Sequence, residues 1–161
     1  MVTRTNKIPK RKNSLRLKNF DYSTPQAYFI TICAENVQDF FLNKKLAENI
    51  IDVLRKNKKR FKYKIYAYCL MPDHLHILLN PGGSNKTVSG IIQAFKSQTS
   101  HNFKGEYGLP LWQRGFYDHI VRDNEDLLKI AQYILENPRR KKLVDQVEDY
   151  PFSGLWDEIE V

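Results

Sequence analysis

The sequence is poor in the residues that cross-link small proteins or embed them in membranes. Its 161 residues include only two cysteines, Cys33 and Cys69, which lie in separate hydrophobic runs and form no CxxC pair. Neither cysteine supplies a zinc knuckle, and buried, reduced thiols are favoured over a disulfide. No run approaches the roughly 18 consecutive apolar residues of a membrane span, and the polar N-terminus lacks the apolar segment of a signal peptide. These absences predict a cytoplasmic protein.

Acidic residues are missing from the first 18 residues, which contain seven Lys or Arg. A second basic block, residues 44–64, contains nine bases against Glu48 and Asp52. The formal net charge of the whole chain is +8, so the remaining residues are mildly acidic. Basic blocks attract polyanions such as nucleic acid, although a solvated lysine-rich helix explains the charge alone equally well.

The length and composition indicate one folded domain. Hydrophobic residues make up 42% of the chain and charged residues 27%, which is typical of a globular protein. Residues 1–18 have no apolar periodicity, so we expect a basic flexible arm there that tethers the protein to a polyanion. The folded domain is expected over residues 19–161.

Hydrophobic periodicity predicts elements in the order β, α, β, β, α, β, α. This order predicts an α+β fold, a ferredoxin-like antiparallel sheet with two crossover helices on one face and an added C-terminal helix. Pro138 is expected to limit the last helix. The strands are expected near residues 27–34, 64–70, 74–79 and 116–122, and the helices near residues 45–60, 87–102 and 124–136.

Two histidines are the sharpest chemical feature. His74 and His76 lie on the third predicted strand, where residues two apart project from the same face and Leu75 and Ile77 project from the other. We expect the aliphatic face to pack under the crossover helices. Two co-facing imidazoles suit a divalent cation, but paired polar residues on a solvated face give the same pattern. Strand alternation would point Asp73 to the opposite face.

The C-terminal helix offers further candidates. At about 100° per residue, Tyr133 and Asn137 stack at the edge of the apolar stripe of this helix. Tyr133 would then lie half-sheltered against the sheet, and Asn137 would offer an amide oxygen to a metal. On periodicity alone, a boundary aromatic residue and a helix-ending residue before Pro138 are the better explanation.

Longer motifs resemble a known family. Residues 71–79 (MPDHLHILL) resemble the HUH motif, His-hydrophobic-His, of the single-tyrosine transposases. Residues 111–122 (LWQRGFYDHIVR), followed by YILENP at 133–138, are similar to the branch associated with repetitive extragenic palindromes (REP). The resemblance extends from about residue 28 to residue 156 and includes YPFS at 150–153.

This resemblance implies an HUH single-tyrosine transposase, which cleaves and rejoins single-stranded hairpin DNA through a 5′-phosphotyrosine intermediate. It implies that His74, His76 and Asn137 hold Mg²⁺ or Mn²⁺ and that Tyr133 is the nucleophile. Transposon-encoded members often have Gln at the position of Asn137. They exchange the nucleophile helix in a dimer, whereas palindrome-associated members work as monomers, so a homodimer and a monomer both stay open. Such an enzyme would act at palindromic repeats or element ends in the nucleoid.

Other interpretations remain beside this one. Tyr117 is a rival nucleophile because Asp118 and His119 adjoin it, although the resemblance places it outside the nucleophile motif. A non-catalytic nucleic-acid-binding module and a non-covalent metal nuclease also fit parts of the pattern. The bases of the 44–64 block would bind phosphates if they face the substrate, and Trp112 would either stack on a base or pack in the core. The expected DNA-binding residues are Lys56, Lys58, Lys59, Arg60, Lys62, Lys64, Lys96, Trp112, Arg139 and Arg140.

Overall fold

The computed structural model describes residues 27–103 and 110–159. The basic arm expected at residues 1–18 therefore lies outside the described residues. The predicted order of elements is confirmed, and a short fifth strand is added at the C-terminal end. The elements are β1 (Ala27–Cys33), α1 (Lys44–Phe61), β2 (Lys64–Met71), β3 (His74–Asn80), α2 (Val88–Phe103), β4 (Tyr117–Val121), α3 (Asn124–Arg140) and β5 (Ser153–Leu155), with 3-10 turns at Glu35–Val37, Phe40–Leu42 and Val147–Asp149.

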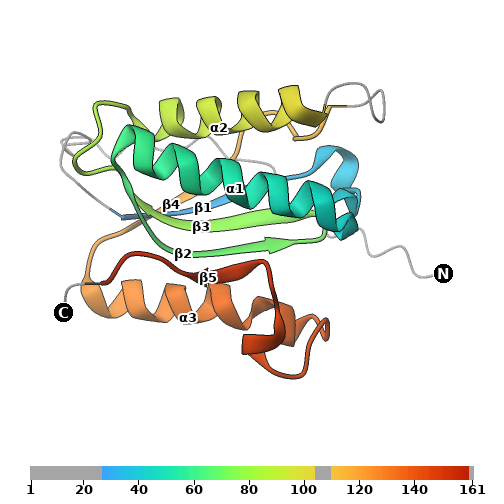
Figure 1. Cartoon of the computed structure of the whole chain (residues 1–161). Helices are drawn as coiled ribbons and strands as arrows, with labels where there is room; N and C mark the ends of the chain where they lie inside the picture. The colour runs from blue at the N-terminus through green and yellow to red at the C-terminus, as the bar shows by residue number, and fades with distance from the viewer. Residues whose placement is uncertain (1–26, 104–109, 160–161) are drawn as a thin grey trace.

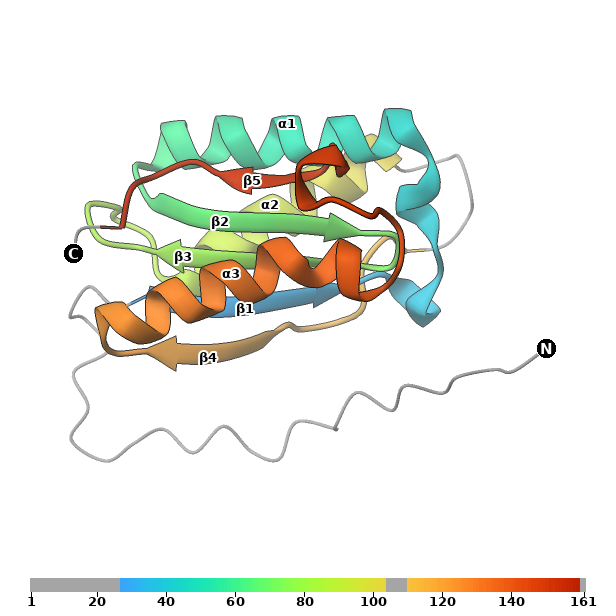
Figure 2. The same cartoon turned by 90° about the horizontal axis from the view of Figure 1, so that it is seen from below.

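The strands form one sheet in the order β4-β1-β3-β2-β5, and every neighbouring pair is antiparallel. The first four strands have the ferredoxin-like arrangement. Helices α1 and α2 cover one face of the sheet, and α3 lies across the other face (Figures 1 and 2). The predicted fold class is therefore confirmed.

Alternation along β3 separates the two faces. Leu75, Ile77 and Leu79 join the hydrophobic core under α1 and α2. Leu78 belongs to a second, smaller core under α3, and His76 projects to this same side. The two-residue period of a strand therefore sends the aliphatic side chains to one layer and the imidazoles to the other, as the sequence pattern predicts.

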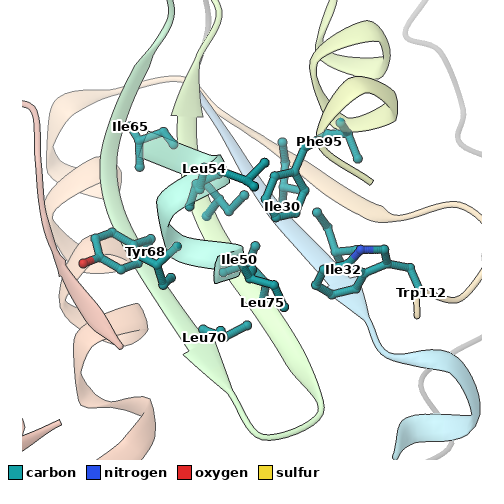
Figure 3. Packing of buried hydrophobic residues seen from close by; sticks show 14 of the residues in the cluster. Ile30, Ile32, Ile50, Leu54, Ile65, Tyr68, Leu70, Leu75, Phe95 and Trp112 are labelled. Atoms are coloured by element: carbon teal, nitrogen blue, oxygen red, sulfur yellow. The ribbon is translucent and has the colours of Figure 1, made fainter. Parts of the chain in front are cut away.

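The larger core explains why one sequence prediction is wrong. Trp112 is only 5% exposed, and its ring packs 5.0 Å from the ring of Phe41 and 5.8 Å from that of Phe95, measured between centroids. Figure 3 shows Trp112 among the core residues, which include Phe95. Its indole Nε1 donates a hydrogen bond to Thr99 Oγ1 at 2.8 Å. Neither face of this ring is free to stack on a DNA base, so Trp112 is a core residue.

Helix α3 is longer than predicted. The side chain of Asp123 caps its first turn by accepting a hydrogen bond from the amide of Asp126 at 2.8 Å. The helix continues through Pro138 to Arg140, so the expectation that Pro138 limits it near residue 136 is wrong. Proline removes one amide donor, but the amide of Lys141 still donates to the carbonyl of Asn137. The additional turn keeps residue 140 in helical register with the residues before it.

The C-terminal segment closes the edge of the sheet at β2. The hydroxyl of Tyr150 donates to the carbonyl oxygen of Leu70 at 2.5 Å, and Trp156 lies against Tyr68 with 4.2 Å between ring centroids. Both cysteines are buried and free, and burial raises the pKa of the Cys69 thiol to about 12. The prediction of buried thiols is confirmed. Within the described residues, no helix combines the length and apolar character needed to cross a membrane.

Candidate active site

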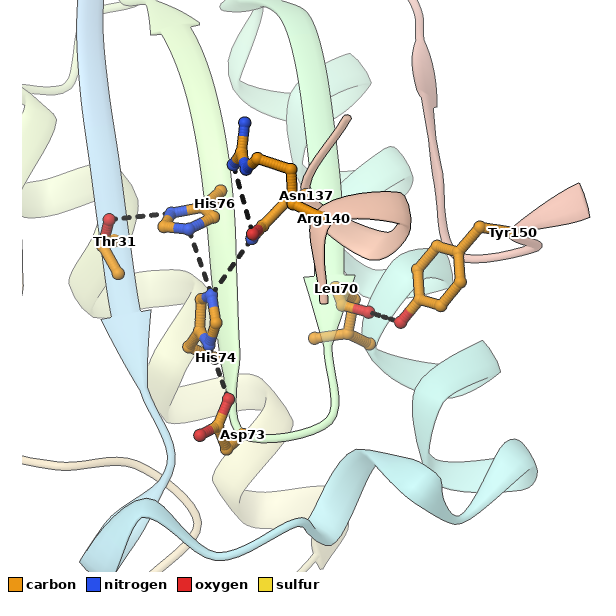
Figure 4. Close-up of polar contacts among 8 residues, drawn as sticks. All are labelled: Thr31, Leu70, Asp73, His74, His76, Asn137, Arg140 and Tyr150. Atoms are coloured by element: carbon orange, nitrogen blue, oxygen red, sulfur yellow. Dashed lines mark hydrogen bonds and ion pairs between the residues drawn. The ribbon is translucent and has the colours of Figure 1, made fainter. Parts of the chain in front are cut away.

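The side chains of His74 and His76 converge on the α3 face of the sheet (Figure 4). Their Nε2 atoms are 3.0 Å apart, and their rings are steeply inclined, at 73° with 4.5 Å between centroids. His76 is 8% exposed and forms the floor of the pair, while His74 is partly open to solvent. The prediction that both imidazoles share one face is confirmed.

Each imidazole is held through its other ring nitrogen. Asp73 Oδ1 lies 2.6 Å from His74 Nδ1, and Thr31 Oγ1 lies 2.8 Å from His76 Nδ1. An ionised carboxylate only accepts, so Asp73 keeps a proton on Nδ1 of His74 and leaves its Nε2 as an acceptor. Asp73 reaches His74 because it lies in the turn between β2 and β3, where the strand alternation that would point it to the other face does not apply.

One arrangement of protons satisfies the whole cluster. His74 Nε2 accepts, so His76 Nε2 donates to it, and His76 Nδ1 accepts the hydroxyl proton of Thr31. Both imidazoles are then neutral, the form that binds metals. Burial, the largest cause, acts together with electrostatic interactions with His74 and Arg140 to lower the pKa of His76 to about 3, although Asp73 opposes this shift.

The carboxyl of Asp73 is also shifted. Burial favours its neutral form, but the hydrogen bond with His74, together with electrostatic interactions with His74 and Lys141, outweighs burial and holds the pKa of Asp73 below its ordinary value. Asp73 therefore stays ionised as an acceptor for His74. This pairing of a carboxylate with the outer nitrogen of an imidazole is the usual way in which proteins orient a metal-binding histidine.

Asn137 brings α3 to the histidine pair. Its side chain is 3% exposed, and its Nδ2 atom lies 3.4 Å from His74 Nε2. Its Oδ1 atom accepts a hydrogen bond from Arg140 at 3.3 Å. Arginine only donates, so the chemistry of this contact requires the amide oxygen on the side of Arg140. The third predicted ligand therefore lies beside the histidines, with its amide nitrogen turned toward them.

Tyr133 lies one turn before Asn137 on the same edge of α3. Its side chain is 50% exposed, and its ring centroid is 6.4 Å from that of His76. Phe29 of β1 stacks on His76 at 5.2 Å and meets the ring of Tyr133 edge-on at 6.1 Å. The guanidinium carbon of Arg140 lies 3.9 Å from the centroid of the tyrosine ring. The half-sheltered position predicted for Tyr133 is therefore observed.

The rival Tyr117 shares the same face but is one strand further away. The register of β4 and β1 places it opposite Thr31, and residues directly opposite on neighbouring strands project from one face. Strand β1 thus lies between Tyr117 and the strand that carries His76. The geometry favours Tyr133 as the residue nearest to the histidines.

The basic block at 44–64 is not at this site. Helix α1 carries most of it on the opposite face of the sheet from the histidines (Figure 1). Three of its lysines are paired with acids, Lys44 with Glu48 at 3.9 Å, Lys56 with Asp52 at 2.9 Å and Lys58 with Asp157 at 3.0 Å. Other predicted phosphate contacts at this end of the molecule are exposed; they are Lys59, Arg60, Lys62 and Lys64.

Lys96 has a structural contact of its own. Its ammonium donates to the carbonyl oxygens of Gln113 at 2.7 Å and Gly115 at 2.8 Å, and this ties α2 to the segment before β4. Burial lowers the pKa of Lys96, while the nearby Cys33 and Glu35 oppose that shift. In this structure the charge of Lys96 is directed to backbone carbonyls rather than to a surface that faces DNA.

The donor set fits a divalent metal with two adjustments: the proton of His76 moves from Nε2 to Nδ1, where Thr31 Oγ1 accepts it, and the Asn137 amide turns its oxygen toward the histidines. In residues 27–103 and 110–159, no three His, Cys, Asp or Glu side chains converge as a metal site. Two neutral imidazole nitrogens do converge, and a buried amide lies beside them, so an amide oxygen would complete the set.

The sequence pattern did not indicate that Thr31 and Phe29 belong to the candidate site. Strand alternation places the two on one face of β1, but only the pairing register puts them beside His76.

Comparison with known proteins agrees with this geometry. The sequence model of a family described as "Transposase IS200 like" matches residues 23–137, which include every residue of the candidate site up to Asn137. An uncharacterized protein of Haemophilus influenzae is 28% identical, with 86% of this chain and 94% of that protein covered. A REP-associated tyrosine transposase of Escherichia coli is 30% identical over 61% of this chain and 58% of its own length.

A solved structure is similar over most of the fold. It is the structure of a REP-associated tyrosine transposase bound to a REP hairpin. The two chains are 25% identical and superpose with a TM-score of 0.64, covering 80% of this chain and 75% of the other.

Proposed function

Because the chain belongs to the IS200-like transposase family, we propose that it cleaves and rejoins single-stranded DNA through Tyr133. The substrate we propose is DNA that folds into a hairpin at palindromic repeats, because the similar solved transposase is bound to a REP hairpin. The observation that carries the proposal is the meeting of two imidazole Nε2 atoms beside a buried amide and a half-exposed helical tyrosine.

The proposed reaction is a transesterification. Tyr133 loses its hydroxyl proton as its oxygen forms a bond to phosphorus, the bond from phosphorus to the 3′ oxygen breaks, and the departing 3′ oxygen takes up a proton, so no net proton is gained or lost. The products are a 5′-phosphotyrosine and a free 3′-hydroxyl. The number of phosphodiester bonds is conserved, so a 3′-hydroxyl reverses the step without ATP.

His74, His76 and Asn137 would hold the divalent cation, Mg²⁺ or Mn²⁺. When bound, such a cation polarises a phosphoryl oxygen and offsets the charge that develops on it. The protein supplies the orientation. Asp73 and Thr31 fix the two rings through their Nδ1 atoms. The two histidines and Tyr133 come from one chain, so a single copy of this chain is sufficient for the proposed site.

Two surfaces are proposed to contact DNA. Arg139 and Arg140 lie in the last turn of α3, next to the candidate site, and would meet phosphates near the cleaved bond. The exposed bases at and just after the end of α1 lie at the end of the sheet remote from His74, where Lys64 of β2 pairs with Asn80, and would meet DNA away from that bond. Those bases are Lys59, Arg60, Lys62 and Lys64.

The test is a covalent adduct assay. The full chain is mixed with a labelled single-stranded oligonucleotide that folds into a hairpin, in the presence of Mn²⁺, and products are separated under denaturing conditions. We expect a protein–DNA adduct that the Tyr133→Phe variant does not form, although this variant still binds the hairpin. The Tyr117→Phe variant is the matched control and should form the adduct.

Each of the other outcomes would indicate a different nucleophile or a different activity for this protein. An adduct formed by Tyr133→Phe would contradict the assignment of the nucleophile. Cleavage without any adduct would indicate a non-covalent metal nuclease. Tight binding with neither cleavage nor adduct would indicate a nucleic-acid-binding module.

A further inference from the structure

The side chain of Arg140 contacts both the candidate nucleophile and the candidate amide ligand. Its guanidinium carbon lies 3.9 Å from the ring centroid of Tyr133. Its guanidinium also donates to Asn137 Oδ1 at 3.3 Å (Figure 4). Residues 133, 137 and 140 are four and three positions apart, so they share one edge of the helix. This edge exists only because α3 continues through Pro138.

The orientation of the Asn137 amide has a consequence for metal binding. Arg140 has only donors, so it fixes the amide oxygen on its own side and leaves the amide nitrogen toward His74. A cation between the histidine Nε2 atoms needs the oxygen instead. The amide must therefore turn over, and Arg140 would then face two amide hydrogens and lose its hydrogen bond.

We propose that Arg140 is a positioning residue that withholds the Asn137 oxygen until a divalent cation binds and that holds the ring of Tyr133 in place. The inference rests on the proposed function for the identity of the cation site. Cation binding turns the amide and frees the donors of Arg140, while the guanidinium still lies on the tyrosine ring. The freed donors are then beside Tyr133, where they suit an incoming DNA phosphate.

Arg139 provides a matched comparison for metal binding. It is the neighbouring residue with the same charge, but its Nε atom is 3.5 Å from Glu136 Oε2 and 57% of its side chain is exposed. Removing either arginine changes the net charge equally. Only the removal of Arg140 takes away a hydrogen bond to Asn137.

The first experiment measures Mn²⁺ binding to the full chain by calorimetry, without DNA. Arg140→Gln should bind Mn²⁺ about two- to tenfold more tightly than wild type, the effect of losing one competing hydrogen bond. Arg139→Gln should bind Mn²⁺ as wild type does. Equal or weaker Mn²⁺ binding by Arg140→Gln would overturn the inference.

A double-mutant cycle separates the hydrogen bond from simple charge repulsion. If Arg140 acts through Asn137, then Arg140→Gln gives no gain in Mn²⁺ affinity when Asn137→Ala is already present. A gain of the same size in that background would show that Arg140 merely repels the cation, and the inference would be wrong. Circular dichroism of each variant checks that it is folded.

The second experiment measures the rate of adduct formation at saturating hairpin and Mn²⁺. Arg140→Gln should slow this step by about tenfold or more, because the ring of Tyr133 is no longer held. Lys129→Gln, an equal charge loss on α3, should not slow it. Tighter metal binding combined with slower chemistry is a result that loss of folding does not produce.

Different results would contradict the role of Arg140 and the proposed function. An Arg140→Gln rate equal to that of Lys129→Gln would remove the role in holding Tyr133. If wild type forms no adduct at Tyr133, the proposed function fails, and the Mn²⁺ cycle still decides whether Arg140 withholds the amide oxygen.

Discussion

The two faces of the sheet differ in what covers them and in what they leave accessible. Under α1 and α2, the side chains of Leu75, Ile77 and Leu79 are fully buried in the larger core. Under α3, a smaller core extends beside the start of β3, where the histidine pair lies near a half-exposed Tyr133. The first face stabilises the fold, and the second face leaves room for a substrate.

The two faces also differ in that one carries many of the basic residues and the other carries the candidate catalytic groups. Much of the positive charge of the described residues lies on α1. The Nε2 atoms of His74 and His76 and the ring of Tyr133 lie on the other face of the sheet, on the side of α3. A basic sequence block therefore marks where a polyanion is attracted, and it does not mark where a phosphodiester would be cut. In this protein the two signals come from opposite sides of one sheet (Figure 2).

Neighbouring residues on β3 provide the strongest way to test this separation. His76→Ala should lower the rate of adduct formation by at least about a hundredfold, because one metal-binding nitrogen is lost, and should keep the protein folded. Leu75→Ala should lower the free energy of unfolding by about 2–5 kcal/mol through the cavity it leaves. Chemical denaturation and the adduct assay measure both effects. Equal effects of the two variants on both quantities would contradict the division of the faces.

A smaller effect is expected from the residue behind His76. Thr31→Val leaves Nδ1 of His76 without its partner, and metal affinity should fall by about 10- to 100-fold. Thr31→Ser keeps a hydroxyl and should retain the affinity. Calorimetry measures the Mn²⁺ affinity of both variants. If valine binds Mn²⁺ as tightly as serine, the hydrogen bond between Thr31 and His76 does not orient the ring.

The smallest effect is expected on the α1 face. Lys59→Gln should reduce the slope of log affinity against log salt concentration by about 0.7, the value for one phosphate of single-stranded DNA. Lys56→Gln should reduce it less, because Lys56 is already paired with Asp52. Fluorescence anisotropy over a salt series measures both slopes. Identical slopes for the two variants and wild type would show that DNA does not reach this end of α1.

Local patterns predicted much of this architecture. The two-residue period of β3 was enough to place His74 and His76 on one face, and the helical stripe of α3 was enough to put Tyr133 at its edge. Both are properties of a single element. The role of Asn137 as a ligand came from the family resemblance, and the structure adds that its amide is buried beside His74.

The features that were missed depend on contacts between distant segments. Strand β5 has three residues, too few to show a period, and it forms because β2 offers a free edge. Thr31 and Arg140 acquire their contacts from strand register and from the last turn of α3. Helix α3 passes Pro138 because only one backbone hydrogen bond is lost there. Trp112 could be assigned to the core only once its packing against Phe95 was known.

The most direct test of the central claim is to locate the covalent bond to DNA. The adduct is digested with nuclease and trypsin, and mass spectrometry identifies the peptide that carries the nucleotide. Tyr133 and Tyr117 fall in different tryptic peptides, residues 130–139 and 115–122. We predict that the nucleotide is on residues 130–139, attached to Tyr133. A nucleotide on residues 115–122 would contradict it and move the nucleophile from α3 to β4.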